Sequence, residues 1–369
     1  MSLDFRFAIL SDPHIGLPHT LLNHPRRFHL VEISIPVLEQ VLEHLCRLEP
    51  DFLLVPGDLT QHGEPDNHTW LSQRLAQLPF PAYVIPGNHD VPVPTADGHS
   101  ISWADFPRYY RQCGYGDTDR HYYTCELLPG VRLIALNSNQ FDDQGRQIGW
   151  LDEAQLHWLE ATLAQHPQDL ILVMVHHNVL EHLPGQSQHP IGRRYMLRNA
   201  PALTQILRQA QVPLVFTGHL HVQDIAQEQG LYDITTGSLV SYPHPYRLVQ
   251  IHPNSSGQLQ VKVESERVQA VPNWPHLQQS SREWMGDRSI SFMTKFLMAP
   301  PLSLPLAKAE AFAPDLRYFW ATIADGDPSF SFPQLPPPLR QFFEAFSVPS
   351  PHGSDAEPYL SANHTQFVL

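Results

Sequence analysis

The chain has 369 residues, 42% of them hydrophobic, which is enough for one large domain with an extensive core. Its formal net charge is −14 with histidine counted as neutral. Such an acidic protein lacks the basic surface that long nucleic acids require, which argues against a processive nuclease. Three cysteines without a CxxC pair indicate neither a zinc ribbon nor a disulfide framework, although a Cys113–Cys125 bridge is an alternative to the reduced state that we expect.

The first half of the chain alternates between short apolar strands and amphipathic helices. Strands are predicted over residues 5–10, 51–56 and 81–86, separated by helices over 28–48 and 67–77. Pro36 lies inside the first helical pattern, so that helix is either kinked there or starts near it. The strand–helix–strand order predicts a right-handed parallel core. No basic or long apolar segment precedes the first strand, and we expect a soluble cytoplasmic protein that does not bind membranes.

Residues 91–130 are less regular and rich in aromatic side chains, which favours a packed insertion with its own small core over a substrate-stacking surface. After it, the pattern predicts strands over 131–136, 170–175 and 212–217, with helices over 152–165 and 201–209. Three further strand-like runs near 231–236, 246–251 and 258–264 are separated by glycine and proline turn signals. We expect these three runs to form a closing antiparallel set.

The composition changes near residue 267, because 14 of the 36 prolines lie beyond it. We therefore divide the chain into a catalytic domain over residues 1–266, a helical proline-rich extension over 267–348 and a flexible tail over 349–369. Helices are predicted over 281–298, 315–324 and 339–346. Their apolar faces must be buried, and we expect the extension to pack on the core or to form a homodimer contact.

Polar motifs follow five of the predicted strands. They are Asp12-x-His14, Gly57-Asp58, Gly87-Asn88-His89-Asp90, His176-His177 and Gly218-His219-x-His221. Open α/β sheets bind ligands at the carboxyl ends of their strands, so these side chains should meet at one edge. Each motif alone is ordinary loop chemistry, but together their oxygen and imidazole ligands suit a pair of divalent transition ions better than one tetrahedral zinc. Asp58 lies between the other ligands in chain order and is the carboxylate best placed to bridge both ions.

In order and residue type, the five motifs resemble those of the calcineurin-like metallophosphoesterase superfamily. The DxH start and the GNHD form resemble in particular its class III cyclic-nucleotide phosphodiesterase branch. The resemblance covers about residues 5–264. It implies an α/β fold with four layers, in which two mixed β-sheets are flanked by helices and the site lies at the strand C-termini. It says nothing about the C-terminal hundred residues.

The resemblance also implies a role for each motif residue. Two divalent transition-metal ions, which are Mn, Fe or Zn, would be held by Asp12, His14 and His221 on one side and by Asn88, His176 and His219 on the other, with Asp58 as the bridge. His89 would lie beside the scissile phosphate without binding metal. Asp90 either orients His89 or caps a turn. Asn178 stands where many relatives have proline, which leaves the metal ligands intact but alters the expected loop shape.

We expect a metal-dependent enzyme that hydrolyses a small phosphodiester, with a 3′,5′-cyclic nucleotide as the first candidate. The alternatives are a glycerophosphodiester hydrolase, a broad-specificity phosphomonoesterase and a non-catalytic scaffold. A scaffold is disfavoured because all ligand positions and His89 are present. Candidate substrate contacts near the strand ends are His177, Arg193, Arg194 and Asn199, with Tyr242 and His244 as further candidates. An arginine pair suits a phosphate oxygen or a ribose, and its alternative is a solvated loop charge.

Overall fold

The computed structural model describes residues 3–21, 27–348 and 359–369. Its first sheet has six strands in the order β14-β13-β12-β1-β2-β3. Their bounds are β1 Phe5–Ile9, β2 Phe52–Val55, β3 Ala82–Val84, β12 Pro245–Pro253, β13 Leu259–Arg267 and β14 His364–Val368. β1, β2 and β3 are parallel, and β12 joins β1 antiparallel. This half of the fold is the parallel core that the alternation of strands and helices predicts.

The second sheet also has six strands, in the order β10-β11-β9-β8-β5-β4. Their bounds are β4 Tyr123–Leu128, β5 Val131–Ala135, β8 Leu170–Met174, β9 Leu214–Thr217, β10 Asp224–Glu228 and β11 Leu231–Thr235. A separate hairpin pairs β6 (Asn139–Phe141) with β7 (Gln147–Gly149). β5, β8, β9 and β11 run parallel, so their carboxyl ends lie along one edge.

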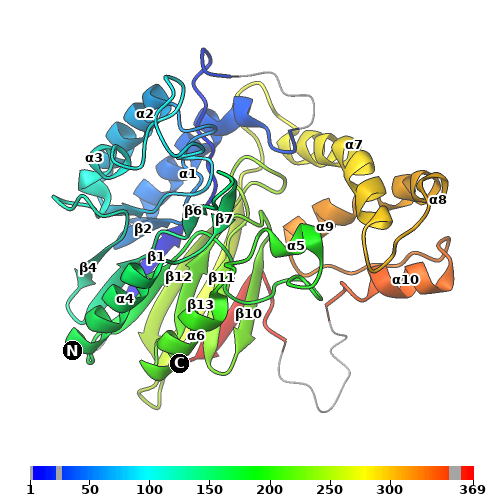
Figure 1. Ribbon diagram of the computed structural model, residues 1–369. Coiled ribbons are helices and arrows are strands. Elements are labelled where there is room, and N and C mark those ends of the chain that lie inside the picture. Colours follow the sequence, from blue (N-terminus) through cyan, green and yellow to red (C-terminus); the bar gives the residue numbers. More distant parts are fainter. Residues whose placement is uncertain (1–2, 22–26, 349–358) are drawn as a thin grey trace.

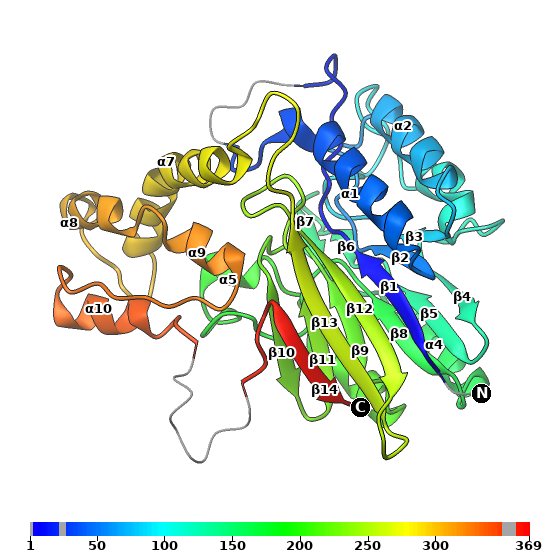
Figure 2. The ribbon, with the colours of Figure 1, turned by 180° about the vertical axis from the view of Figure 1, so that it is seen from behind.

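The two sheets pack face to face and helices cover both outer faces, which gives the four layers expected from the sequence (Figure 1; Figure 2). The ring of Phe7 in β1 lies 5.5 Å from that of Phe216 in β9, at nearly a right angle. α1 (Ser34–Leu48) and α2 (Pro65–Ala76) lie beside the first sheet. α4 (Glu153–Gln165) and α6 (Ala200–Gln209) pack their buried leucines against the second sheet. The sandwich is therefore closed by amphipathic helices on both sides.

Two local expectations from the sequence are resolved by the helix and strand bounds. α1 begins at Ser34, after the short 3-10 turn η1 (Val31–Ile33), so Pro36 lies in the first turn rather than at a kink. The run near 231–236 does not belong to an antiparallel closing set, because β11 pairs parallel with β9 in the second sheet. Alternation of apolar residues predicts that a strand exists but does not name its partner. Of the three predicted runs, the two that form β12 and β13 close the first sheet antiparallel.

The aromatic insertion has no separate core among the described residues. Phe106, Tyr110, Tyr115 and Tyr123 are buried in the same hydrophobic cluster as the first sheet. They flank α3 (Phe106–Tyr109) and the 3-10 turn η2 (Arg111–Cys113). The hydroxyl of Tyr123 donates to the carbonyl of Val84 in β3, at 3.0 Å. The insertion therefore extends the main core. The three cysteines, which lie in or beside this core, form no disulfide.

The C-terminal extension is helical and lies to one side of the sandwich (Figure 1). Its elements are α7 Leu277–Met298, α8 Leu306–Phe312, η3 Ala313–Leu316, α9 Phe319–Asp325 and α10 Pro337–Glu344. These helices share one hydrophobic cluster with Leu220 and Val222, which belong to the loop after β9. The extension is thus packed on the catalytic half of the chain, at the loop that carries the Gly218-His219-x-His221 motif.

The end of the chain differs from the flexible tail that the sequence suggested. His364–Val368 forms β14 and pairs antiparallel with β13 at the edge of the first sheet (Figure 2). The fully buried guanidinium of Arg247 fixes the approach to this strand, because it donates to the carbonyl of Ala362 at 2.6 Å. Residues 349–358 of the predicted tail lie outside the described residues. A polar composition alone did not reveal that the last segment adds a strand.

Candidate metal centre

The loops that follow β1 and β2 run side by side and carry the first three candidate ligands. The backbone amide of Asp12 donates to the carbonyl of Gly57 at 3.2 Å, and that of His14 donates to the carbonyl of Asp58 at 2.9 Å. Asp12, His14 and Asp58 are all buried and have left-handed backbones, with φ of 50°, 41° and 48°. Such conformations are rare for residues with a Cβ atom and cluster at functional sites.

The Gly87-Asn88-His89-Asp90 loop is held against the Asp58 loop by the Asp90 carboxylate. This carboxylate accepts hydrogen bonds from the backbone amides of Gly87, Leu59 and Thr60, at 2.7, 3.0 and 2.8 Å. Asp90 therefore fixes the relative position of two loops and does not contact the His89 ring. Of the two roles considered from the sequence, the structure supports that of a turn residue. The small size of Gly87 is required here, because a Cβ atom would lie 2.2 Å from Oδ1 of Asp58.

The loop after β8 places His176 and His177 on different faces of the site. Nε2 of His176 lies 3.4 Å from Oδ2 of Asp58 and 3.3 Å from Oδ1 of Asn88. Nδ1 of His176 donates to the carbonyl of Pro56 at 2.7 Å, which fixes the ring and leaves Nε2 facing the candidate ligands. Such a backbone partner is typical of a metal-binding histidine. Nδ1 of His177 instead lies 2.8 Å from the hydroxyl of Ser138.

Asn178, the departure from the family pattern, has a structural role in this loop. Its amide nitrogen donates to the hydroxyls of Thr217 and Thr235, at 3.0 and 3.2 Å, and its amide oxygen accepts from Gln186 at 3.2 Å. All these partners are buried or lie at the strand ends. A buried amide with its donors and acceptor satisfied stabilises a loop in one conformation. The side-chain bonds of Asn178 thus hold this loop in one conformation.

The loop after β9 brings the last two candidate ligands to the same place. His219 and His221 have φ of 65° and 59°, so they share the left-handed conformation of the ligands on the first two loops. Nε2 of His221 lies 3.3 Å from Oδ1 of Asp12. The backbone amide of His219 donates to the Asp12 carboxylate at 3.2 Å. A Cβ atom at Gly218 would lie 2.6 Å from Oδ2 of Asp12, so the glycine permits this close approach.

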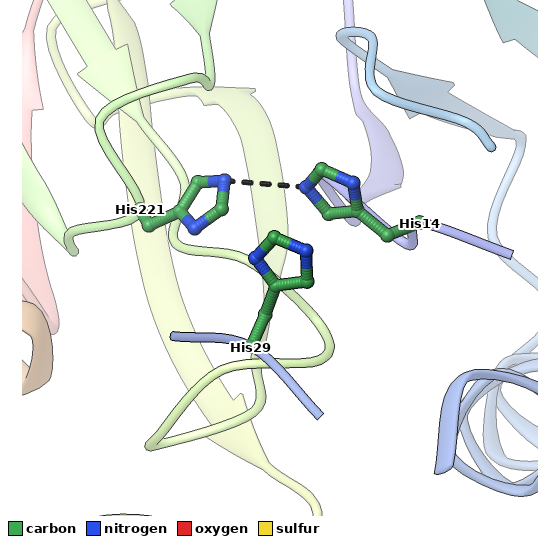
Figure 3. Close-up of side chains that lie close together, drawn as sticks. All are labelled: His14, His29 and His221. Atoms are coloured by element: carbon green, nitrogen blue, oxygen red, sulfur yellow. Dashed lines mark hydrogen bonds between the residues drawn. The ribbon is translucent and has the colours of Figure 1, made fainter. Parts of the chain in front are cut away.

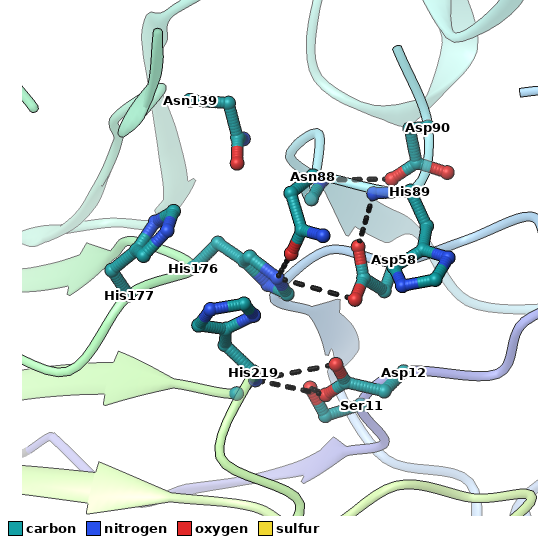
Figure 4. A network of polar contacts seen from close by, with 12 residues as sticks. Ser11, Asp12, Asp58, Asn88, His89, Asp90, Asn139, His176, His177 and His219 are labelled. Carbon is teal, nitrogen blue, oxygen red and sulfur yellow. Dashed lines mark hydrogen bonds and ion pairs between the residues drawn. The ribbon is translucent and has the colours of Figure 1, made fainter. Parts of the chain in front are cut away.

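The seven predicted metal ligands therefore meet at one edge of the two sheets. Figure 4 shows Asp12, Asp58, Asn88, His176 and His219, and Figure 3 shows His14 and His221. Their ligand atoms form two compact groups within 4.8 Å. One group consists of Asp12, His14, Asp58 and His221, and the other of Asp58, His176 and His219, beside Asn88. Asp58 is the residue common to both groups. This is the arrangement that a carboxylate bridging two ions would produce.

His29 joins the first group although the sequence analysis did not single it out. Its ring stacks on that of His14 at 4.4 Å, and its ligand atom lies within 4.8 Å of those of His14 and His221 (Figure 3). Nε2 of His29 lies 2.9 Å from the side-chain oxygen of Gln61. The residue precedes α1 and follows no strand, so a search for polar residues at strand ends could not find it. An isolated histidine just before a helix carries no stronger sequence signal.

Burial sets the protonation of several rings in the site. Burial, with neighbouring histidines, holds the pKa of His14, His29 and His219 well below 6.5, so these rings are neutral at pH 7. Neutral imidazole is the form that binds metal ions. Burial also disfavours the charged form of His176, but the Asp58 carboxylate outweighs it and raises the pKa of His176 to about 9.

The donor set fits divalent cations. It combines two carboxylates and an amide oxygen with four imidazole rings, which suits Mn, Fe or Zn. Nδ1 of His14 is buried and has no hydrogen-bond partner among the described residues, while its Nε2 lies 3.4 Å from Nε2 of His221. A positive charge between these groups would compensate the negative charge of the buried Asp12 and Asp58 carboxylates. A buried carboxylate is energetically costly when no opposite charge accompanies it.

A cavity of about 430 Å³ opens over the candidate ligands, a volume suited to a small molecule. Asp58, Asn88 and His89 line it from the catalytic side. Two of the proposed substrate contacts, His177 and Arg194, line the same cavity. Burial lowers the pKa of His177 to about 3, with the neighbouring His176 adding to the effect, so this ring offers no charge to a phosphate.

The other four substrate candidates are not among the described residues that line this cavity. Arg193 lines a different cavity, beside Arg198 and Arg208. The Asn199 side chain is engaged by the backbone of Leu151, at 2.8 and 3.1 Å, and sits at the start of α6. The hydroxyl of Tyr242 donates to Asp325, at 3.2 Å. His244 is buried, with Nδ1 3.0 Å from the carbonyl of Leu239. Proximity in sequence to a strand end does not determine the direction in which a side chain points. The partners of these side chains therefore do not support a role in substrate binding.

The family follows from a comparison of this sequence with family models. The model described as "Calcineurin-like phosphoesterase" matches residues 5–223, which span β1 to the loop that carries His219 and His221. The chain belongs to this family. As a calcineurin-like phosphoesterase it is a metal-dependent phosphoester hydrolase and uses divalent metal ions. The helical extension lies beyond the matched residues.

Similar proteins carry phosphodiesterase names. A probable cyclic nucleotide phosphodiesterase of Synechococcus is 30% identical over 201 residues, which cover 54% of this chain and 68% of that protein. A probable glycerophosphodiester phosphodiesterase of Arcobacter nitrofigilis is 28% identical over 219 residues, with coverage of 58% and 70%. A 3′,5′-cyclic-nucleotide phosphodiesterase of Nostoc is 25% identical over 216 residues, with coverage of 58% and 72%. These names are consistent with the class III branch of the calcineurin-like family.

Among solved structures, a dimetal phosphatase from Danio rerio matches with a TM-score of 0.53 at 16% identity, over 71% of this chain and 96% of that one. At this identity the match shows the fold alone. Within the described residues, helices that combine the length and apolar character needed to cross a bilayer are absent.

Proposed function

We propose that this calcineurin-like phosphoesterase hydrolyses a small phosphodiester with two divalent metal ions, and that a 3′,5′-cyclic nucleotide is its first candidate substrate. The observation that carries the proposal is the pair of ligand groups that share Asp58. His89 borders the same cavity, and its backbone amide donates to Oδ1 of Asp58 at 2.8 Å. The names of the relatives from Synechococcus and Nostoc support the choice of a cyclic nucleotide.

The two ligand groups support a separate set of binding residues for each ion. Asp12, His14 and His221 would hold one ion, Asn88, His176 and His219 the other, and Asp58 would contact both. When bound, the ions supply Lewis acidity, which neutralises phosphate charge and activates water for attack. The carbonyl of Pro56 keeps the His176 ring oriented, and the amides that bind Asp90 keep the Asn88 loop in register with Asp58.

His89 is the residue that we assign to the phosphate. Its Nδ1 lies 2.7 Å from the carbonyl oxygen of Gln61, so the proton on Nδ1 is held by the backbone. Nε2 is then the ring atom left for the substrate. When Nε2 also carries a proton, the ring is an imidazolium that can stabilise negative charge on a phosphate oxygen or protonate the departing alkoxide. His89 therefore acts as the acid of the reaction without serving as a ligand.

A substrate panel tests the proposal. Metal-free protein is reloaded with Mn, Zn or Fe(II) and assayed with cyclic AMP, bis-p-nitrophenyl phosphate, p-nitrophenyl phosphate and glycerophosphocholine. We expect diester hydrolysis only in metal-loaded protein, with cyclic AMP among the substrates. Absence of hydrolysis of every substrate in every metal form would overturn the proposal.

Glycerophosphodiester hydrolysis is the second candidate, because the relative from Arcobacter nitrofigilis carries that name over a similar length of the chain. Turnover of glycerophosphocholine without turnover of cyclic AMP would favour it. Both outcomes retain the metal centre and the diester, and they differ only in the ester groups that the cavity accepts.

A further inference from the structure

The helical extension lines part of the cavity over the candidate metal ligands. Met285 and Phe292 of α7 and Trp320 of α9 line the same cavity as Asp58 and His89. Phe292 and Trp320 are only half-buried, so part of each aromatic side chain is open to the cavity. The helical extension is therefore a direct part of the site rather than a distant appendage.

Three aromatic rings that line this cavity are neighbours of one another: Phe28, Phe292 and Trp320. The ring of Phe292 lies 5.7 Å from that of Phe28 and 5.7 Å from that of Trp320. Tyr195 also lines the cavity, and its ring lies 5.1 Å from that of His219. We define Phe28, Tyr195, Phe292 and Trp320 as the aromatic wall. It extends from the ligand loop to the extension.

The wall is held in place by packing and by ion pairs. Leu220, between the candidate ligands His219 and His221, is buried in the hydrophobic cluster of the extension. Arg317, which precedes α9, forms ion pairs at 2.6 Å with Glu283 and Asp287 of α7. α7 and the residues before α9 are also closely packed, because a Cβ atom at Gly286 would lie 2.9 Å from the Tyr318 ring. The aromatic wall is therefore preorganised.

The space beyond the wall is largely apolar as well. Tyr195 and Trp320 also line a second cavity of about 370 Å³, whose other walls include Ile191, Phe296 and Phe342. Among the described residues that line this second cavity, there is no aspartate, glutamate, lysine or arginine. The second cavity is thus lined by apolar and uncharged polar side chains, among them Gln186 and His189.

We propose that the aromatic wall binds a flat aromatic ring carried by an ester group of the phosphodiester. This inference rests on the proposed function and adds the chemical class of the ester group. Aromatic side chains bind flat rings by stacking and by burial of apolar area, and the contribution is about 1–3 kcal/mol per stacked base in nucleic-acid sites. In a cyclic nucleotide the ring is the base, whereas in an aryl diester it is the aryl group.

Three diesters with one leaving group test the proposal in metal-loaded wild-type protein. They are 2,2,2-trifluoroethyl phosphates whose second ester group is methyl, cyclohexyl or phenyl, and release of trifluoroethanol is measured, so that the leaving group itself carries no ring. We expect kcat/KM to be roughly 10- to 100-fold higher for the phenyl than for the methyl ester, the range that stacking of one ring supplies. The cyclohexyl ester should fall clearly below the phenyl ester, because it is apolar but not flat.

Variants then locate the effect. Trp320→Ala and Phe292→Ala should each lower the phenyl-to-methyl ratio toward one. Phe330→Ala is the matched control, because Phe330 lies in the same extension and packs on Phe319 at 4.7 Å, but is not among the described residues lining either cavity. It should keep the wild-type ratio. Thermal melting of each variant separates loss of selectivity from loss of folding.

The outcomes are distinguishable from failure of the proposed function. Hydrolysis of all three esters with equal kcat/KM would overturn the aromatic wall and leave the phosphodiesterase intact. A cyclohexyl ester as good as the phenyl ester would also overturn it, since the wall would then select only for apolar character. Hydrolysis of none would overturn the proposed function itself. A further comparison of cyclic AMP with base-free ribose 3′,5′-cyclic phosphate tests the base as the source of the ring, and equal rates would overturn that assignment.

Discussion

Nδ1 of His89 lies 2.7 Å from the backbone carbonyl oxygen of Gln61, in the loop that follows β2. The side-chain oxygen of the same Gln61 lies 2.9 Å from Nε2 of His29. One residue thus orients two histidines of the site, one through its backbone and one through its side chain. Because a carbonyl can only accept, His89 carries its proton on Nδ1 and presents Nε2 to the cavity.

Replacement of His89 should separate catalysis from metal binding. We expect His89→Ala to keep its metal ions and to lose about 10²- to 10⁴-fold in kcat, the usual contribution of a positioned acid. Metal content per chain and kcat measured on the same preparation decide the matter. A variant that loses metal along with activity would identify His89 as a ligand and contradict the assignment.

Asp58 should be indispensable for both ions, because it is shared by the two ligand groups. We expect Asp58→Ala to bind less than one metal ion per chain and to have no measurable turnover. Asp66→Ala serves as the control, since Asp66 lies on the exposed surface of α2 with a side chain 69% accessible. Two tightly bound ions in Asp58→Ala, measured by elemental analysis, would exclude a bridging role.

The sequence predicted which residues gather at the candidate metal site more completely than it predicted the parts of the chain that surround them. Asp12, Asp58 and His219 each follow a buried apolar strand, and parallel strands bring such positions to one edge whatever the details of packing. The pattern therefore places these residues together without knowledge of the helices. His29 escaped because its position depends on the path of the chain before α1, which no strand pattern encodes.

Two strands that the sequence pattern missed, β10 and β14, lie at the edges of the sheets. β10 has only one buried residue of five and sits at the edge of the second sheet, so its composition gives little strand signal. β14 adds to β13 across about a hundred residues, and its place depends on contacts such as that of Arg247 with the carbonyl of Ala362. Periodicity reports local burial, whereas such pairings are decided by tertiary contacts.

The buried ring of His182 should make stability depend on pH above neutrality. Burial disfavours its charge, but Asp233 at 3.2 Å and Asp224 at 2.8 Å outweigh burial and raise the pKa of His182 to about 9. The folded state binds this proton more tightly than the unfolded state, in which the pKa is about 6.5. The resulting stabilisation is therefore fully present below pH 6.5 and is lost as the pH rises through 9.

We expect this single group to contribute about 3 kcal/mol to the free energy of unfolding at pH 6, from about 1.4 kcal/mol per unit of pKa. Denaturant unfolding of wild type and of His182→Gln between pH 6 and pH 10 measures it. The wild-type free energy of unfolding should fall toward that of the variant as the pH rises. Parallel pH curves for the two proteins would show that folding does not raise the pKa of His182.

The choice between diester and monoester depends on the fixed positive charge in the cavity. The sequence offered only the loop arginines, but the structure adds Arg27, which lines the cavity and is 8% exposed. Arg27 is paired with Glu32 by a short hydrogen bond, so its charge is largely balanced. Arg194 is exposed and lies over the ring of Tyr195, with its guanidinium carbon 4.6 Å from the ring centre.

A monoester dianion carries one more negative charge than a diester, and neither arginine is placed as an unpaired, buried cation that would balance it. We therefore expect kcat/KM for bis-p-nitrophenyl phosphate to exceed that for p-nitrophenyl phosphate in the same metal form. Glu32→Gln provides an internal test, because it frees the Arg27 charge and should shift the ratio toward the monoester. A wild-type ratio below one would instead identify the enzyme as a monoesterase. In that case Arg27→Met and Arg194→Met would show which guanidinium binds the second negative charge, because the responsible substitution alone would restore a preference for the diester.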